Sequence, residues 1–180
     1  MILVVAANDR ELAGIDGAET LSTGIGPVEA GLATAFALQK DRPDVVLQIG
    51  IAGSRTLQPP ALVLGTEAIY CDVLDAGSTL PRVERVLPDE NLLAAARAAL
   101  PEAHVLPIGT SGRVGGATDC DVEAMEGFAV LRAAALAGVP ALELRAISNA
   151  VDEPDRAHWR FDDAFAALRD AVARLLPALA

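Results

Sequence analysis

Short runs of branched apolar residues alternate with longer helical patterns along this chain, and this alternation constrains the fold more than any other feature. The apolar runs at residues 2–7, 45–49 and 141–147 are each bounded by polar or turn-forming residues. Runs this short and this apolar are typical of largely parallel strands that are buried on both faces. The segments with helical periodicity are 27–40, 89–100, 125–137 and 161–176. The alternation predicts an α/β fold.

Further segments extend the expected sheet and set the size of the domain. Residues 19–23, 66–73 and 104–108 also have strand character. A chain of 180 residues is long enough for one sizeable core and short for two ordinary domains, and the sequence contains no internal repeat or linker. We therefore expect one domain over residues 1–180, in which helices cover the sheet.

The charge balance narrows the class of partner. The formal net charge is −11 and Lys40 is the only lysine, so no basic stripe is available for a nucleic acid, and an acidic surface disfavours anionic membranes. No apolar run reaches the roughly 20 residues that span a bilayer. The chain opens at Met1 on a strand pattern rather than a signal peptide. We expect a cytoplasmic protein that binds a small molecule.

Metal and cofactor motifs are missing from the sequence. Cys71 and Cys120 form no CxxC pair, and His104 and His158 are not spaced as metal ligands. The sequence also has no HExxH, Walker lysine or GxSxG motif. We therefore expect no metal and no cofactor, and we expect both cysteines to be reduced core or loop thiols.

Glycine-rich loops lie at or near the ends of several expected strands, where open α/β sheets bind their ligands. They occupy residues 24–26, 50–53 and 109–116. The first loop precedes a helix, as in dinucleotide sites, but its next glycine is Gly31 and strand 45–49 is not followed by an acid, so we do not favour a dinucleotide. The third loop could be a substrate lid, although a mobile connection is the commoner case.

Four polar residues in apolar surroundings are candidates for chemistry. They are Glu11, Glu123, Glu126 and Asn149, the last of which directly follows strand 141–147. Each also has an ordinary structural explanation: Glu11 in the first turn of a helix, Glu123 as a solvated cap, Glu126 on the polar face of a helix, and Asn149 in a turn. For any one residue taken alone, the structural explanation is preferred.

Taken together, the segments around these residues resemble the purine nucleoside phosphorylase and methylthioadenosine nucleosidase superfamily. NDREL, TGIGPVEA, QIGIAG, VEAMEG and RAISN occur in the superfamily's order, the last two beginning at Val122 and Arg145. The tail through Asp155 to Arg160 resembles the futalosine hydrolases, nucleosidases of menaquinone biosynthesis, although the chain is shorter than typical members before Asp121. The resemblance implies a single-domain, three-layer phosphorylase/hydrolase-like fold with a central mixed sheet flanked by helices.

The resemblance also implies roles in breaking the bond between a purine base and ribose. It places Glu126 against the ribose hydroxyls and Met125 against the sugar as an apolar contact. It makes Glu11 the general base that positions and deprotonates the attacking water. We therefore predict three catalytic residues, Glu11, Glu126 and Asn149.

Asn149 is the position that discriminates between bases. Adenine-specific relatives carry Asp there, whereas the Asn149 amide offers an NH₂ donor to N7 or to a 6-oxo group. A 6-oxopurine nucleoside, with hypoxanthine as its base, is therefore favoured. Ser148 would orient this loop or simply cap the turn.

The remaining predicted contacts are Gly50, Ile51 and Ala52 in the second glycine loop and Arg156 and Trp159 in the tail. Futalosine carries a benzoate-like carboxylate, and an arginine beside an aromatic ring can receive such a group. The alternative, that Arg156 and Arg160 only solvate the start of the last helix, is somewhat favoured.

Hydrolysis is preferred over phosphorolysis because the phosphate-binding Arg and Ser of bacterial phosphorylases are matched here by Gln48 and Ile51. Arg10 and Arg55 are close enough in sequence to substitute as cations. Two alternatives therefore stay open: a phosphate-dependent purine nucleoside phosphorylase, and a non-catalytic nucleoside-binding protein. Superfamily members usually associate, so we also expect a homo-oligomer.

Overall fold

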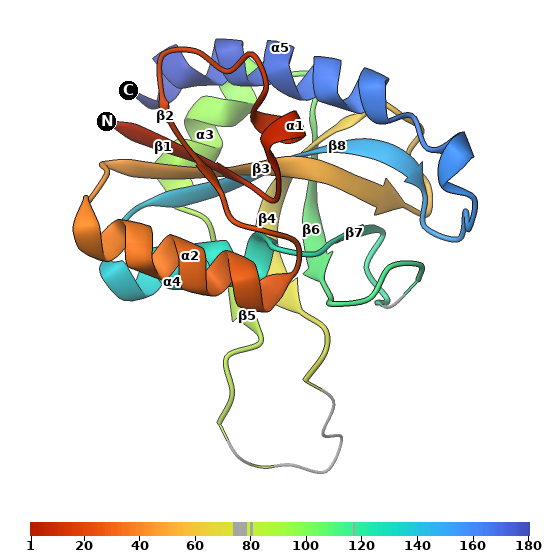
Figure 1. The fold of residues 1–180 in the computed structure, drawn as a ribbon, viewed down its shortest axis with the longest axis horizontal. Helices are drawn as coiled ribbons and strands as arrows, with labels where there is room; N and C mark the ends of the chain where they lie inside the picture. The colour runs from red at the N-terminus through yellow and green to blue at the C-terminus, as the bar shows by residue number, and fades with distance from the viewer. Residues whose placement is uncertain (74–78, 80, 117) are drawn as a thin grey trace.

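Strands and helices are mixed along the whole computed structural model, which describes residues 1–73, 79, 81–116 and 118–180 (Figure 1). In chain order the elements are β1 (Ile2–Ala6), α1 (Asp9–Leu12), β2 (Glu19–Ser22), α2 (Pro27–Lys40), β3 (Val45–Ser54), β4 (Leu62–Tyr70), β5 (Arg85–Val86), α3 (Glu90–Ala99), β6 (His104–Thr110), β7 (Val122–Ala124), α4 (Gly127–Ala137), β8 (Ala141–Ala150), the 3-10 helix η1 (Arg156–His158) and α5 (Phe161–Leu179). The predicted α/β class is confirmed.

The strands form one mixed sheet that closes on itself. β1 lies between β2 and β3, and all three are parallel. From β3 the pairing runs to β8 in parallel, to β4 antiparallel, to β6 and β7 in parallel, and back to β3 antiparallel. β3, β8, β4, β6 and β7 therefore make a closed ring, while β1, β2 and the short β5 lie outside it.

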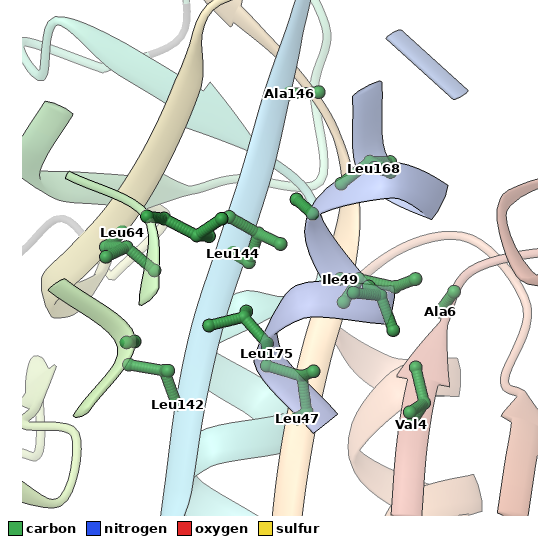
Figure 2. Close-up of a cluster of buried hydrophobic side chains, with 14 of the residues drawn as sticks. Val4, Ala6, Leu47, Ile49, Leu64, Leu142, Leu144, Ala146, Leu168 and Leu175 are labelled. Atoms are coloured by element: carbon green, nitrogen blue, oxygen red, sulfur yellow. The ribbon is translucent and has the colours of Figure 1, made fainter. Parts of the chain in front are cut away.

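Helices cover both faces of the sheet, with α3 and α5 on one face and α2 and α4 on the other (Figure 1). Side chains alternate along β3 and β8, so Leu47, Ile49 and Leu144 pack under α5 against Leu168 and Leu175 (Figure 2). Each fully buried side chain of this kind stabilises the fold by roughly 1.5–3 kcal/mol. None of the helices in the described ranges is long and apolar enough to span a membrane.

Several predicted boundaries were wrong, and sheet pairing explains most of the differences. Helix α4 begins at Gly127 rather than at residue 125, because residues 122–124 form β7 and the chain has first to leave the sheet. β4 covers Leu62–Tyr70 instead of 66–73, since its first residues pair with β8. The third glycine loop starts after Thr110, as Gly109 and Thr110 belong to β6. The very short β5 and β7 and the four-residue α1 have too few residues to show a period.

Candidate active site

A cavity of about 280 Å³ lies where strands β3, β7 and β8 end. Its walls also include the start of α1, the loop after β6, the start of α4 and the first turns of α5. The predicted site residues on its wall are Glu11, Ile51, Ala52, Met125, Glu126, Ser148, Asn149, Arg156 and Trp159. Gly50 is the predicted site residue that does not line it. The fold thus brings together residues from both ends of the sequence.

Glu11 reaches the cavity from the short helix α1. It completes a capping box with Asn8, whose side-chain Nδ2 donates to Glu11 Oε2 over 2.9 Å. The Ile51 N–H donates to Glu11 Oε1 over 3.0 Å. Burial raises the pKa of Glu11, and the Ile51 hydrogen bond and the Arg145 charge oppose that rise. Glu11 therefore both caps the first turn of α1 and lines the cavity.

Glu126 stands at the N-cap of α4, and both of its carboxylate oxygens have partners. The Gly26 N–H donates to Oε1 over 3.1 Å, and Arg145 Nη1 donates to Oε2 over 3.3 Å. Gly26 has φ 97°, a conformation that favours glycine, and this turn aims its N–H at Glu126. The first glycine loop therefore donates a backbone hydrogen bond to a carboxylate of the protein itself. Glu126 is 4% exposed and precedes the first residue of α4, so the interpretation as a residue on the polar face of a helix was wrong.

Gly50 leaves room for two charged side chains that cross the backbone of β3. A β-carbon at this position would overlap the Arg145 guanidinium and would lie 2.9 Å from Glu11 Oε1. Gly50 and Arg145 are directly opposite each other in the β3–β8 register. Gly50 therefore shapes the site from behind rather than from within the cavity. Arg145 could not be assigned a role from the sequence alone.

Ser148 and Asn149 lie near the end of strand β8, at the cavity wall. The Ser148 hydroxyl donates to Asn149 Oδ1 over 2.7 Å, and Asn149 Nδ2 donates to the Ala150 carbonyl over 2.8 Å. Asn149 is 6% exposed and belongs to β8, so the interpretation as a turn residue was wrong. The Ala150 carbonyl takes one N–H of the Asn149 amide, so the second N–H is left to donate.

Glu123 is not a solvated cap, because it lies in β7 and is 9% exposed. Its Oε1 accepts hydrogen bonds from Arg55 Nη2 over 2.9 Å and from the backbone N–H and hydroxyl of Thr118, each over 3.0 Å. Glu123 thereby holds Thr118, in the segment before β7, by two hydrogen bonds. Arg113, Val114 and Gly115 in the loop after β6 also line the cavity.

Aromatic rings and arginines form one end of the cavity. Arg156 lies over the Trp159 ring at 5.4 Å, and Arg10 lies over the Phe165 ring at 5.0 Å. Trp159 and Phe161 are 5.5 Å apart, so the rings continue from η1 into α5. Sequence reasoning named Arg10 only as a possible phosphate-binding cation and gave the two phenylalanines no role, because the contact of Arg10 with their rings arises from the packing of α1 on α5.

Cysteine and metal chemistry have little support in the described residues. Cys71 and Cys120 are free, half-buried thiols. Burial, and after it the neighbouring Cys120, raise the pKa of Cys71 to about 11. Within residues 1–73, 79, 81–116 and 118–180, no three histidine, cysteine, aspartate or glutamate side chains group as metal ligands would.

Solved structures of nucleosidases share this fold. A 5′-methylthioadenosine/S-adenosylhomocysteine nucleosidase from Colwellia psychrerythraea, in complex with adenine, has a TM-score of 0.86 at 20% identity, with 99% of this chain and 95% of that chain covered. A futalosine hydrolase mutant from Helicobacter pylori has a TM-score of 0.82 at 20% identity, with 99% and 97% covered. At these identities the likeness shows the fold, and it confirms the central mixed sheet flanked by helices.

Sequence comparison places the chain more narrowly. Residues 20–180 match the model of the phosphorylase superfamily. A futalosine hydrolase from Streptomyces coelicolor is 38% identical in an alignment of 191 positions that covers 91% of this chain and 80% of that protein. A second, from Thermus thermophilus, is 31% identical, with 87% and 80% covered. The chain therefore belongs to the phosphorylase superfamily and, within it, to the futalosine hydrolase family.

Proposed function

We propose that this chain hydrolyses the N-glycosidic bond of a 6-oxopurine nucleoside, and that this nucleoside is futalosine, which is split into hypoxanthine and dehypoxanthine futalosine. The observation that carries the proposal is the convergence of two buried carboxylates, Glu11 and Glu126, and the Asn149 amide on one cavity. The two relatives named futalosine hydrolase support the choice of substrate.

The arrangement of charges suits the chemistry of this bond. Cleavage develops positive charge on the ribose ring and negative charge on the departing base, so carboxylates belong beside the sugar and donors beside the base. Glu126 accepts hydrogen bonds from the ribose hydroxyls, with Met125 against the sugar. Glu11 takes a proton from the attacking water, a role that its raised pKa suits. Asn149 donates to the base.

Water is the proposed nucleophile because the residues at the expected phosphate-binding positions are poor ligands for phosphate. Ile51 lines the cavity with an apolar side chain. Arg55, one of the two cations considered as a substitute for the phosphate-binding arginine, is paired with Glu123 and is not on the cavity wall. Arg10 lies at the aromatic end of the cavity, over Phe165. These contacts favour hydrolysis over the phosphorylase alternative.

Incubation with futalosine, inosine and methylthioadenosine, each with and without phosphate, tests the proposal. We expect hypoxanthine from futalosine without phosphate and without added metal. Strict dependence on phosphate would identify a phosphorylase, and loss of activity with a chelator would contradict the metal-free mechanism. The single tryptophan, Trp159, lies on the cavity wall, so its fluorescence reports binding. Binding without release of base would identify a non-catalytic protein.

Replacing Asn149 with Asp should shift the choice of base from hypoxanthine toward adenine. A carboxylate presents an acceptor to the N7 and O6 acceptors of hypoxanthine, whereas a protonated carboxyl group serves N7 and the 6-amino group of adenine. Unmet polar groups cost about 1–3 kcal/mol, so the hypoxanthine-to-adenine ratio of kcat/KM should fall by roughly 5- to 150-fold. Competition between inosine and adenosine substrates measures the ratio. An unchanged ratio would mean that Asn149 does not contact the base.

We further propose that Arg156 and Trp159 receive the carboxylated aryl group of futalosine. A guanidinium stacked on a ring pairs with such a group more strongly than with a neutral one, so Arg156→Ala should lower kcat/KM for futalosine by about 10-fold. Inosine lacks the carboxylate and should be cleaved as before. Arg160→Ala is the matched control, because Arg160 pairs with Asp163 at the start of α5. Equal kcat/KM for futalosine in wild type and Arg156→Ala would mean that Arg156 and Arg160 only solvate the start of the last helix.

A homo-oligomer is proposed from the exposed apolar face of α2. Val28, Leu32 and Phe36 are 67%, 54% and 69% exposed and recur every four residues, and Ile25 just before them lines the cavity. Phe36→Glu should therefore lower the molar mass measured by light scattering toward that of one chain. Ala98→Glu adds the same charge at an exposed position of α3, on the opposite face of the sheet, and should leave the mass unchanged. The same mass in wild type and Phe36→Glu would contradict this interface.

A further inference from the structure

Two charged side chains lie fully inside the protein behind the cavity. Glu143 and Arg145 are two residues apart on β8, so they point to the same face of the sheet, and each is 1% exposed. Arg145 Nε donates to Glu143 Oε1 over 2.8 Å. A buried ion pair is often no more stabilising than apolar side chains of similar volume, because both charges lose their hydration. Stability alone therefore does not explain why this strand carries the pair.

Arg145 connects Glu143 to the carboxylate that we propose holds the ribose. Its Nη1 lies 3.3 Å from Glu126 Oε2 and 3.4 Å from the Ile51 carbonyl oxygen. Glu126 and Ile51 both line the cavity, whereas Glu143 does not. The guanidinium is therefore held between one carboxylate behind the site and another within it.

Glu143 also packs against the start of the helix that carries Glu126. A β-carbon at Gly127 would overlap the Glu143 carboxyl group, so the glycine at this position leaves the room that Glu143 occupies. Gly127 is the first residue of α4 and directly follows Glu126. One buried carboxyl group thus contacts both the cation and the backbone that place Glu126.

We infer that Glu143 is a positioning residue for glycosidic cleavage, which acts through Arg145 to set the place of the Glu126 carboxylate and the charge around it. The inference rests on the proposed function, in which Glu126 holds the ribose. Because Arg145 divides its charge between two carboxylates, Glu126 keeps more negative charge for the developing cation of the sugar. If Glu143 were absent, the guanidinium would neutralise Glu126 more completely.

The charges around Glu143 make this effect measurable as a change with pH. Burial raises the pKa of Glu143, Arg145 opposes the rise, and Glu126 adds to it. Arg145 on β8 and Glu126 at the start of α4 are the charged groups that face Glu143 in the described chain, and Glu11 also interacts with Arg145. Glu143 Oε2 and Arg145 Nη2 lack hydrogen-bond partners among the described residues. Removing the Glu143 charge should therefore strengthen the hold of Arg145 on Glu126 and Glu11, and lower the pKa of Glu11.

Two variants and a control test the inference. Glu143→Gln keeps an acceptor for Arg145 Nε but loses the charge, and we expect kcat for futalosine to fall by about 10-fold. Glu143→Leu loses both, and we expect a fall of about 100-fold. In Glu143→Gln the acidic limb of kcat/KM should move to lower pH. Thr34→Val is the matched control, because Thr34 is a fully buried polar residue of α2 outside the cavity whose hydroxyl has no partner in the described chain.

The outcomes separate this inference from the proposed function. Wild-type kinetics in folded Glu143→Gln and Glu143→Leu would overturn it, and so would slower turnover with the acidic limb unmoved, which indicates a structural role. Should Glu143→Leu not fold, Glu143→Gln decides. A wild type that releases no base would end the proposed function. In that case inosine binding, followed by Trp159 fluorescence, decides whether Glu143 positions Glu126, and equal affinity in wild type and Glu143→Gln would overturn the inference.

Discussion

Glu126→Gln is expected to lower kcat by on the order of 100-fold or more while the protein stays folded. The carboxylate has two donors around it, the Gly26 N–H and Arg145 Nη1, and glutamine has one acceptor oxygen for both. The variant also loses the negative charge that stabilises a positively charged ribose. Steady-state kinetics with futalosine measure the loss, and circular dichroism with thermal melting confirms the fold.

The control for Glu126 is Glu29→Gln. Glu29 is an exposed acid in the first turn of α2, close to the same glycine loop but outside the cavity. Its substitution removes the same charge without touching a cavity contact, so activity should be retained. Near-normal kinetics in Glu126→Gln would remove Glu126 from the proposed machinery.

Glu11→Gln is expected to lower kcat by roughly 10²- to 10⁴-fold, the usual contribution of a general base. The wild-type pH profile should carry the signature of this group. Burial raises the pKa of Glu11, so activity should fall, as pH is lowered, through a value above the ordinary range of a glutamic acid. A protonated Glu11 cannot accept a proton from water, and in the glutamine variant this limb should disappear.

Asp9→Asn is the control for Glu11, since Asp9 is an exposed acid in the same helical turn and does not line the cavity. The two variants lose equal charge from α1. If Glu11→Gln alters thermal stability and leaves turnover and the pH profile as in wild type, the residue is a helix-start acid and nothing more.

The parts of the fold that periodicity predicts well are the long, regular ones. Helix α2 begins and ends where its sequence predicts, because Pro27 suits a first helical position and residue 41 leaves the helix. Strand β3 begins at the predicted residue but continues to Ser54, since its far end pairs with both β7 and β8. Pairing between distant segments leaves no period in the sequence, so β7 and the true start of α4 could not be found.

In the candidate site too, sequence motifs predict some residues, and contacts between distant segments determine the others. Glu11, Glu126 and Asn149 came from motifs in a familiar order, and the fold gathers all three at one cavity. Arg145 and Glu143 were missed because their link to the site runs through Glu126, which comes from a different element. A signal was available: charges at alternate positions within a strand otherwise apolar enough to be buried predict a buried pair on one face.

The ring of strands makes the cavity a product of long-range assembly. β7 closes the ring by joining β3 to β6, and Glu126 follows β7 by two residues, while Ile51 belongs to β3. Helices form from local contacts, but pairings between distant strands must first overcome the entropy of closing the chain between them. A partly folded chain with its helices in place and β7 unpaired would therefore have a normal helical spectrum and no complete site. We therefore expect the site to become complete only in the folding step in which β7 pairs with β3 and β6.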